Sequence, residues 1–397
     1  MKDTLLHTGR IAHSPYLWAI LSVFIGLMGQ FFLVTVNYGG NWTGLFRTGD
    51  KFTLASGFEE YTYVFNGSPG YDGQFYRYVA HDPLGTKGFW KHVDSPAIRY
   101  SRIFVPGISY LIAFGKKKWI DTAYYLVVLL CLFFGSLFLS KWAMLGNGHP
   151  AWGPVFMVLP GTVISLWMMT GEISLLALTT AFAFFWRSGC RMGIYITLIL
   201  SALCRETGLI LTAGLCLWFL IGGEYRNGIL YATAVIPAGI WYAYIHCAMP
   251  GASSVVPTWL VSQPTTGIIH AFLEPETFAR SDHILFWVRF FDRVSILGML
   301  VLFFMALRNL WKLQLSPITL SAGLHVLLGI VVNNVTFWRI PLGYTRPFST
   351  LLLLAGLQCM TSEPSTRDKL IISVSILAVS LRIILQLIYT EGTQFLH

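Results

Sequence analysis

One short segment of the chain, Gly70-Tyr-Asp-Gly-Gln-Phe-Tyr-Arg-Tyr-Val-Ala-His-Asp-Pro83, carries residue types suited to a carbohydrate site. Glycines on both sides of Asp72 give a flexible backbone, so the carboxylate could approach a substrate closely. Neighbouring rings such as Tyr71 and Tyr76 suit a membrane interface or stacking on a sugar. An ordinary Asp-Gly turn is the alternative interpretation.

A second segment, Asp94-Ser-Pro-Ala-Ile-Arg-Tyr-Ser-Arg-Ile-Phe-Val-Pro106, places Arg99 and Arg102 three residues apart, on one face if it is helical. Guanidinium groups bind phosphate oxygens in a bidentate way. The pair therefore predicts a phosphate clamp at the water–lipid boundary, with ordinary headgroup anchoring as the alternative. For the lysines at 116–118, which follow, headgroup contact is the favoured interpretation.

The elements that must position these residues are expected to lie in a membrane. Hydrophobic residues make up 55% of the 397 positions and charged residues 11%, whereas a soluble domain has roughly 25% charged residues. This composition excludes a soluble globular enzyme and a disordered chain. The net charge of +9 is explained by positive-inside bias and anionic lipid, so no nucleic-acid partner is expected.

Apolar runs define the expected topology. The run 16–36 follows Lys2 and Arg10 and predicts a retained anchor with a cytoplasmic N-terminus. We expect 37–118 to form a large outer catalytic loop with interfacial helices. Its apolar segment 103–115 is short, and we place it along the outer interface. Basic residues of the short loops then concentrate on the cytoplasmic side, whereas a crossing at 103–115 would remove that bias.

The resulting prediction is an all-α, polytopic integral membrane protein with about eleven transmembrane helices in a single domain over 1–397. A second outer loop, 249–283, separates the transmembrane helices of 119–248 from those of 284–390. After the first, the expected helices run over 119–140, 151–169, 172–187, 192–205, 207–221, 228–248, 284–307, 316–337, 347–360 and 370–389.

Several charged residues come toward the outer face in this topology. Charges at a membrane edge are functional candidates by default. They are Glu172, Arg205, Glu206, Arg289, Asp292, Arg293, Arg339 and Arg346. The alternative is that they form structural ion pairs, Arg205 with Glu206 and Asp292 with Arg289 or Arg293.

A metal site could be assembled from His81, Asp82, His92 and Asp94. Their spacing matches no standard zinc pattern, and carboxylates with water would hold Mg or Mn only weakly. A divalent cation, Mg or Mn, is retained as a candidate cofactor, but no residues are assigned as its ligands. The sequence contains no Walker A, HExxH or nucleophile-elbow motif, so nucleotide chemistry is not expected from it.

In layout and in three motifs, the chain resembles the GT-C superfamily of membrane glycosyltransferases, which includes the protein O-mannosyltransferases and the lipid A aminoarabinose transferases. The layout is one helix, a large outer loop with an early acidic residue, and many hydrophobic helices. The motifs YDGQFYRYVAHDP, DSPAIRYSRIFVP and ALCRETGLIL look like those of bacterial GT-C-type proteins linked to cell-surface glycopolymer formation.

The resemblance implies an inverting transfer of a hexosyl or pentosyl group from a polyprenyl-phosphate donor to a glycan or glycolipid acceptor. The site would face the outside of the bacterial inner membrane. Asp72 would be the general base, and Arg99, Arg102 and Arg346 would hold the departing phosphate. Glu172 matches a polar residue that faces the site in related enzymes, and Asp82 is a candidate second acid. Further expected substrate-binding residues are Tyr71, Gln74, Tyr76, Tyr100, Arg205 and Glu206.

Two other functions fit the same membrane-edge charges. One is a transporter or flippase for a glycolipid or a polyprenyl-linked sugar, and the other is a non-catalytic subunit of a glycan-assembly complex. A transporter would be expected to show inverted repeats and discontinuous helices around a mid-membrane site. The polar residues here concentrate in one outer loop instead, which favours the enzyme.

Overall fold

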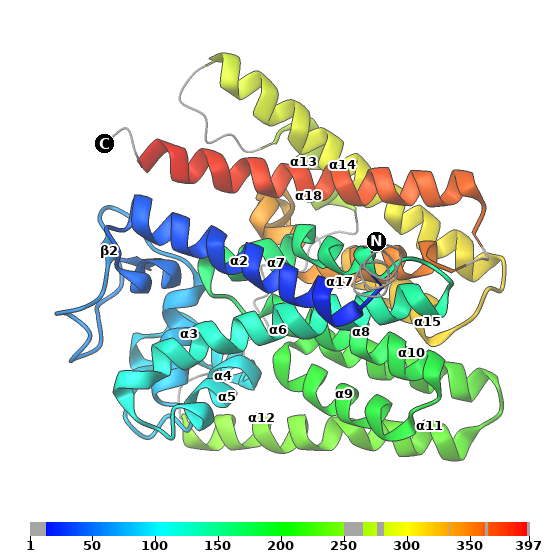
Figure 1. Cartoon of the computed structure of the whole chain (residues 1–397), viewed down its shortest axis with the longest axis horizontal. Helices are drawn as coiled ribbons and strands as arrows, with labels where there is room; N and C mark the ends of the chain where they lie inside the picture. Colours follow the sequence, from blue (N-terminus) through cyan, green and yellow to red (C-terminus); the bar gives the residue numbers. More distant parts are fainter. Residues whose placement is uncertain (1–12, 250–264, 276–281, 333, 362–363, 395–397) are drawn as a thin grey trace, which may run out of the picture. The chain divides into compact units, whose positions relative to one another are not determined.

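The computed structural model describes residues 13–249, 265–275, 282–332, 334–361 and 364–394 (Figure 1). Helices carry nearly all the regular structure in these ranges. The strands found there are β1 (Thr48–Gly49) and β2 (Val64–Phe65), which pair in parallel with Thr48 opposite Val64. The fold is all-α, as predicted.

Five helical segments are long and apolar enough to span a membrane, which makes this a membrane protein of several spans. They are Pro15–Asn37 (α2), Lys117–Leu145 (α6), Tyr225–Ala248 (α11 to α12), Ile284–Trp311 (in α14) and Thr366–Thr390 (in α18). The 3-10 helix η3 (Pro150–Val158) and α7 (Pro160–Met168) make a sixth if they are one span bent by 63°.

The expected number of eleven crossings exceeds the number of long apolar helices in the described ranges. Three of the expected segments are apolar but shorter, namely Arg191–Cys204, Glu206–Ile221 and Pro317–Val331. The longest of the three reaches only about 24 Å at 1.5 Å per residue, short of a hydrocarbon core of roughly 30 Å. The finer count of eleven therefore stays a prediction.

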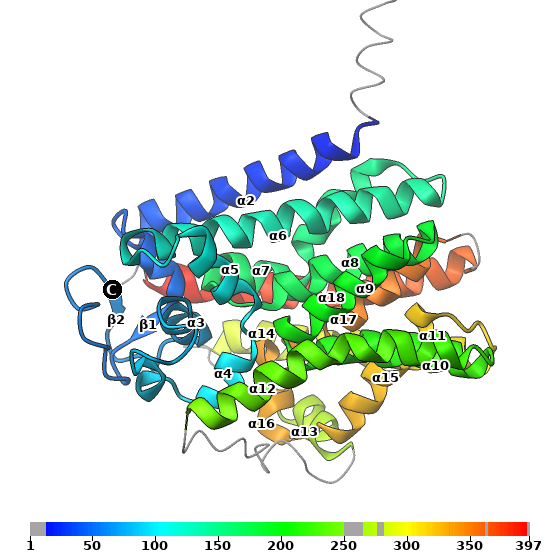
Figure 2. The same cartoon turned by 90° about the horizontal axis from the view of Figure 1, so that it is seen from below.

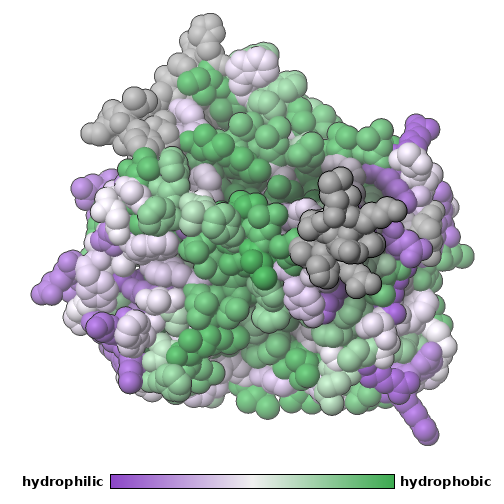
Figure 3. Space-filling model, in the orientation of Figure 1, coloured by the Kyte–Doolittle hydropathy of each residue, from purple (hydrophilic) through white to green (hydrophobic). Residues whose placement is uncertain are grey.

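Two compact units divide the chain, and each is described by itself. The first comprises Met1–Met157, Thr162–Leu209 and Ala234–Ser254. In it α2 lies beside α6 (Figures 1 and 2), α6 packs on α8 (Glu172–Ser188), and α8 packs on α9 (Arg191–Cys204). The outward side of α2 is hydrophobic (Figure 3), with Phe24 and Phe32 exposed, as expected of a lipid-facing helix.

The predicted outer loop is folded in the first unit as short helices over a core of its own. These helices are η1 (Trp42–Phe46), α3 (Asp72–His81), η2 (Phe89–His92), α4 (Pro96–Ser101) and α5 (Phe104–Ile112). Phe58, Tyr78 and Tyr100 are buried together with Ile245 of α12 (Ile236–Ala248). The nine residues of α5 span about 13 Å, too short to cross a membrane.

The second unit comprises Val158–Gly161, Ile210–Thr233 and Val255–His397. In it α14 and α17 both pack against α18. Its helices are α10 (Leu209–Ile221), α11 (Tyr225–Ala232), α13 (Thr266–Leu273), α14 (Asp282–Trp311), α15 (Pro317–Val331), α16 (Val335–Arg339), α17 (Pro341–Cys359) and α18 (Thr366–Gln394). Most of the predicted outer loop 249–283 lies outside the described residues, as do Lys2 and Arg10.

The helix expected over 316–337 is wrong as a single element, because the structure has α15 and α16 there. Asn334 caps α16 by accepting hydrogen bonds from the amides of Thr336 and Phe337, which starts a new helix. The helix expected over 347–360 begins earlier, at Pro341, because a proline is well suited to the first helical turn.

A buried ion pair joins α14 to α18 in the second unit. Arg382 Nε lies 2.5 Å from Asp292 Oδ1, and both side chains are buried. The expected pairing of Asp292 with Arg289 or Arg293 is therefore wrong. The sequence suggested partners close to Asp292 on the same helix. The actual partner, Arg382, lies on α18, 90 residues further along the chain. Arg339 pairs with Glu274, at 2.5 Å.

Candidate functional site

The site is built around the start of α3, where Asp72 is the first helical residue. Tyr71 caps the helix in an extended conformation and donates its amide to the Arg47 carbonyl at 2.9 Å. A Cβ on Gly73 would overlap the carbonyl oxygens of Met168 and Phe46, so α3 can approach these segments only with glycine there. The Asp72 carboxylate lies at the positive end of the helix dipole, a favourable place for an anion.

Arg99 of α4 holds this carboxylate in a bidentate ion pair. Its Nη1 lies 2.6 Å from Asp72 Oδ2 and its Nη2 lies 2.8 Å from Oδ1. The same guanidinium bonds Asp94, with Nε 2.9 Å from Oδ1 and Nη2 2.8 Å from Oδ2. Burial lowers the pKa of Arg99, but the Asp72 and Asp94 carboxylates outweigh it and hold that pKa well above its usual value. Arg99 is therefore a charged bridge that fixes the orientation of Asp72.

Arg102 follows α4 and connects it to Glu206, the first residue of the 3-10 helix η4 (Glu206–Gly208). Its Nη1 donates to the Tyr76 hydroxyl at 2.8 Å, and its Nη2 lies 3.1 Å from Glu206 Oε2. The Ser101 hydroxyl also donates to Glu206, at 3.0 Å. Burial lowers the pKa of Arg102, but Glu206 more than reverses this, so the pKa is raised. The Glu206 side chain is 44% exposed, more than the carboxylates of Asp72, Asp94 and Glu172.

Glu172 and Arg205 form the next ion pair. Glu172 is the buried first residue of α8, and Arg205 ends α9 with an extended backbone. The expected pairing of Arg205 with Glu206 is therefore wrong: the two neighbours pair with Glu172 and Arg102, respectively. An extended backbone directs successive side chains in opposite directions, which explains why neighbours reach different partners.

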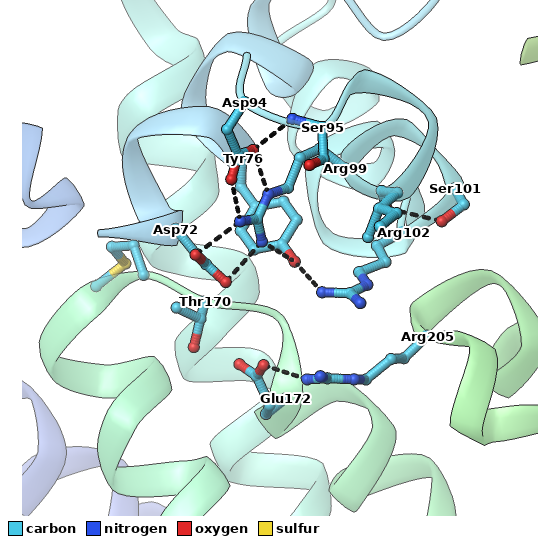
Figure 4. A network of polar contacts seen from close by, with 12 residues as sticks. Asp72, Tyr76, Asp94, Ser95, Arg99, Ser101, Arg102, Thr170, Glu172 and Arg205 are labelled. Carbon is cyan, nitrogen blue, oxygen red and sulfur yellow. Dashed lines mark hydrogen bonds and ion pairs between the residues drawn. The ribbon is translucent and has the colours of Figure 1, made fainter. Parts of the chain in front are cut away.

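We name this set of residues the arginine–carboxylate cluster (Figure 4). Its members are Asp72, Tyr76, Asp94, Arg99, Arg102, Glu172, Arg205 and Glu206. In Figure 4, Thr170 lies between Asp72 and Glu172, so the ion pairs line one region of the first unit. Three guanidinium groups meet four carboxylates, which gives the cluster a formal charge of −1. An anionic group must therefore compete with a carboxylate for an arginine.

Two other expected site residues have structural contacts of their own. Gln74 donates to the Pro69 carbonyl at 2.9 Å and accepts from the Gly49 amide at 3.2 Å. Asp82 ends α3 and accepts from the Lys87 amide at 2.9 Å, so it caps the following turn. Ten residues of helix separate it from Asp72 by about 15 Å, which argues against Asp82 as a second acid beside Asp72.

Tyr100 and Arg346 complete the predicted set. Tyr100 is buried in the hydrophobic core of the outer loop, and burial raises the pKa of its phenol. Its backbone carbonyl accepts from Trp241 Nε1 at 2.8 Å. Arg346 lies on α17, in the second unit.

The residues considered for a metal site have separate partners. His81 Nε2 lies 2.9 Å from Asp121, His92 Nδ1 lies 3.0 Å from the Thr53 carbonyl, and Asp94 bonds Arg99. Within the described ranges, no three His, Cys, Asp or Glu side chains gather in a way that could hold a metal ion.

Sequence reasoning missed a second buried network, formed by Arg77 and His81 of α3 with Asp121 of α6. Arg77 Nη2 lies 2.6 Å from Asp121 Oδ2, and its Nη1 donates to the Thr62 hydroxyl at 2.8 Å. Burial lowers the pKa of His81 despite its hydrogen bond to Asp121. The available signals were two basic residues four apart on one helical face and an isolated aspartate at the start of a long apolar segment.

Fold and site together define an all-α membrane protein with a largely buried arginine–carboxylate cluster in its first unit. No protein-family model matches the chain, and no curated protein or solved structure matches it either.

Proposed function

We propose that the chain is a membrane glycosyltransferase. It transfers a sugar from a polyprenyl-phosphate donor to a glycan or glycolipid acceptor on the outer face of the bacterial inner membrane, with inversion at the anomeric carbon. One observation carries the proposal: Asp72, fixed by Arg99 at the start of α3, shares a cluster with Arg102, whose carboxylate partner, Glu206, is half exposed. A fixed carboxylate can serve as the base and an arginine can stabilise the leaving phosphate, which are the two roles that this transfer requires.

In the proposed reaction, the acceptor hydroxyl oxygen attacks the anomeric carbon while Asp72 takes the hydroxyl proton. The bond between the anomeric carbon and the phosphate oxygen breaks, and its electron pair leaves with the polyprenyl phosphate. Arg102 stabilises the charge that develops on this leaving group. The phosphate displaces Glu206 from Arg102, because that carboxylate is the exposed partner. The resemblance also assigns a phosphate contact to Arg346, which lies on α17 in the second unit, and that assignment stays a proposal.

The eleven-crossing topology belongs to the same proposal. It requires the short segments Arg191–Cys204, Glu206–Ile221 and Pro317–Val331 to cross the membrane. Single cysteines placed in the loops on either side of each segment, in a background without the native cysteines, should react with an impermeant thiol reagent from opposite faces of sealed vesicles. Labelling of both loops from one face would contradict a crossing.

The central test uses Asp72→Asn in the purified full chain with a labelled polyprenyl-phosphate sugar. Loss of a general base should lower the transfer rate by about 10²- to 10⁴-fold. Asp50→Asn is the matched control, because Asp50 is an exposed aspartate of the same outer loop that accepts from the Gly67 amide at 2.7 Å and is not a member of the cluster. Full transfer by Asp72→Asn would overturn the assignment of the base.

The alternative functions have distinct outcomes in the same preparation. A flippase would move labelled glycolipid across sealed vesicles equally well in the unsubstituted chain and in the Asp72→Asn variant, and neither protein would transfer sugar. A non-catalytic subunit would show neither activity alone, while the Asp72→Asn chain would still support glycan assembly in cells.

A further inference from the structure

The turn between α5 and α6 has an unusual backbone. Phe114 has a positive φ of 52°, in the left-handed region that bulky side chains avoid, and Gly115 follows with φ 68°. Three hydrogen bonds hold the turn, from the amides of Phe114, Gly115 and Lys116 to carbonyls of residues 110–113. These hydrogen bonds therefore hold the left-handed backbone at Phe114, and backbone of this kind is frequent at functional sites.

This turn presents large apolar side chains outward. Phe114 is 87% exposed, Leu111 is 71% exposed and Trp119 is 52% exposed. In water, such exposure is unfavourable in addition to the backbone strain. In a hydrocarbon environment the exposure of these apolar side chains is no longer unfavourable. Tryptophan is a residue that favours the boundary between lipid and water. The turn therefore suits insertion into the lipid.

A cleft of about 320 Å³ opens beside the turn. Ile112, Ala113 and Phe114 line it from the α5 side, and Trp119 and Leu126 line it from α6. This apolar lining is suited to a hydrocarbon chain, and the volume falls within the range of small-ligand sites, roughly 300–1,000 Å³.

Lysines give this cleft a positive rim. Lys116 lines it, is exposed, and has no carboxylate partner in the described part of the chain. Lys118 Nζ lies 5.5 Å from the centre of the Trp119 ring. Lys117 is different, because its Nζ donates to the Gly57 carbonyl at 2.7 Å and so holds the outer loop. Lys116 therefore borders the apolar cleft, Lys118 lies over the ring of Trp119, which lines it, and neither lysine pairs with a carboxylate of the described residues.

We propose that the cleft binds an anionic phospholipid of the surrounding bilayer. One acyl chain lies along the apolar lining, and the headgroup phosphate contacts Lys116 and Lys118. Charge complementarity determines the choice of ligand: a headgroup with net negative charge satisfies both lysines, whereas a zwitterionic headgroup brings a cation of its own. The inference goes beyond the proposed transfer reaction and does not depend on it.

The test measures fluorescence quenching of Trp119 in nanodiscs, with the full chain and phospholipids brominated on the acyl chain. Brominated phosphatidylglycerol and brominated phosphatidylcholine are compared at equal mole fraction, and the signal of Trp119→Phe is subtracted to isolate Trp119. We expect stronger quenching by the phosphatidylglycerol. In Lys116→Gln and Lys118→Gln, half-maximal quenching should require about fivefold more of this lipid for each lysine removed.

Lys91→Gln is the matched control, because Lys91 is an exposed lysine over a tryptophan, 5.8 Å from the Trp90 ring centre, and lies outside the cleft. It should leave the preference unchanged. Equal quenching of Trp119 by both lipids would overturn the proposal, as would a preference retained when Lys116 and Lys118 are both replaced. Displacement of the brominated lipid by an equimolar amount of polyprenyl phosphate would also overturn it, by assigning the cleft to that lipid.

Discussion

The guanidinium of Arg99 contacts both carboxylate oxygens of Asp72, at 2.6 Å and 2.8 Å, although the two residues come from different helices. A bidentate pair fixes the plane of the carboxylate as well as its position. Arg99 is therefore a positioning residue for Asp72 in the proposed reaction, and its geometry matters as much as its charge.

Arg99→Lys should lower the transfer rate by about 100-fold, because lysine keeps the charge and loses the bidentate geometry that orients Asp72. The fall should appear in kcat more than in KM for the donor. Asp94→Asn should cost much less, since Arg99 would still hold Asp72. Steady-state kinetics of the two variants, with the labelled donor, measure this difference. Equal losses in both would show that the cluster acts only as a structural unit.

Arg77→Met should lower the free energy of unfolding by about 3 kcal/mol, because it leaves the Asp121 carboxylate without its main partner. The double variant Arg77→Met with Asp121→Leu should be less destabilised than the single one, since no unpaired charge remains. Thermal unfolding in detergent micelles compares the two. A double variant that is less stable than Arg77→Met would contradict the role given to this ion pair.

The pH dependence of stability should contain a contribution from His81. Its pKa in the folded chain is lowered by burial below the ordinary value of 6.5. In the interval between the two values, the unfolded chain binds a proton that the folded chain does not, so stability falls as pH decreases through that interval. Melting temperatures measured from about pH 5 to 8, the range in which histidine ordinarily titrates, should show this fall, and His81→Gln should reduce its slope. An unchanged slope would assign the effect to other groups.

Gly73→Ala should destabilise the protein by roughly 1–3 kcal/mol, because the new methyl group would overlap backbone oxygens that cannot move aside easily. It should also lower the transfer rate, since the start of α3 carries Asp72. Gly29→Ala is the control, because a Cβ there meets no atom within 4 Å. Melting temperature and transfer rate are the measurements, and a Gly73→Ala protein equal to Gly29→Ala in both would be inconsistent with this packing.

Much of the secondary structure could be predicted from the sequence. The runs 16–36 and 172–187 match α2 and α8 to within one residue at each end, because long apolar segments have clear polar boundaries. Sequence also indicated Asp72 from its glycine- and tyrosine-rich motif, Arg99 from its spacing to Arg102, and Glu172 as a charge beside apolar runs. What it could not provide is the partner of each charge.

The partners depend on tertiary packing. Arg205 and Glu206 are neighbours in sequence, yet they bond Glu172 and Arg102. Asp82 lies in the same motif as Asp72, yet a helix carries it to the opposite end of α3. Spacing along the chain indicates which residues share a face of one helix. It does not indicate which residues of different helices are in contact.

The Asp292–Arg382 pair has a consequence for biosynthesis. A charged residue inside a transmembrane helix is unfavourable during membrane insertion, and each of these helices carries one that pairs with the other. Because α18 is synthesised after α14, Asp292 has no ion-pair partner during synthesis until Arg382 of α18 has been made. A chain truncated before α18 should therefore retain α14 in the membrane poorly, and Asp292→Leu should restore its retention. Assembly of the second unit is in this sense completed from its C-terminal end.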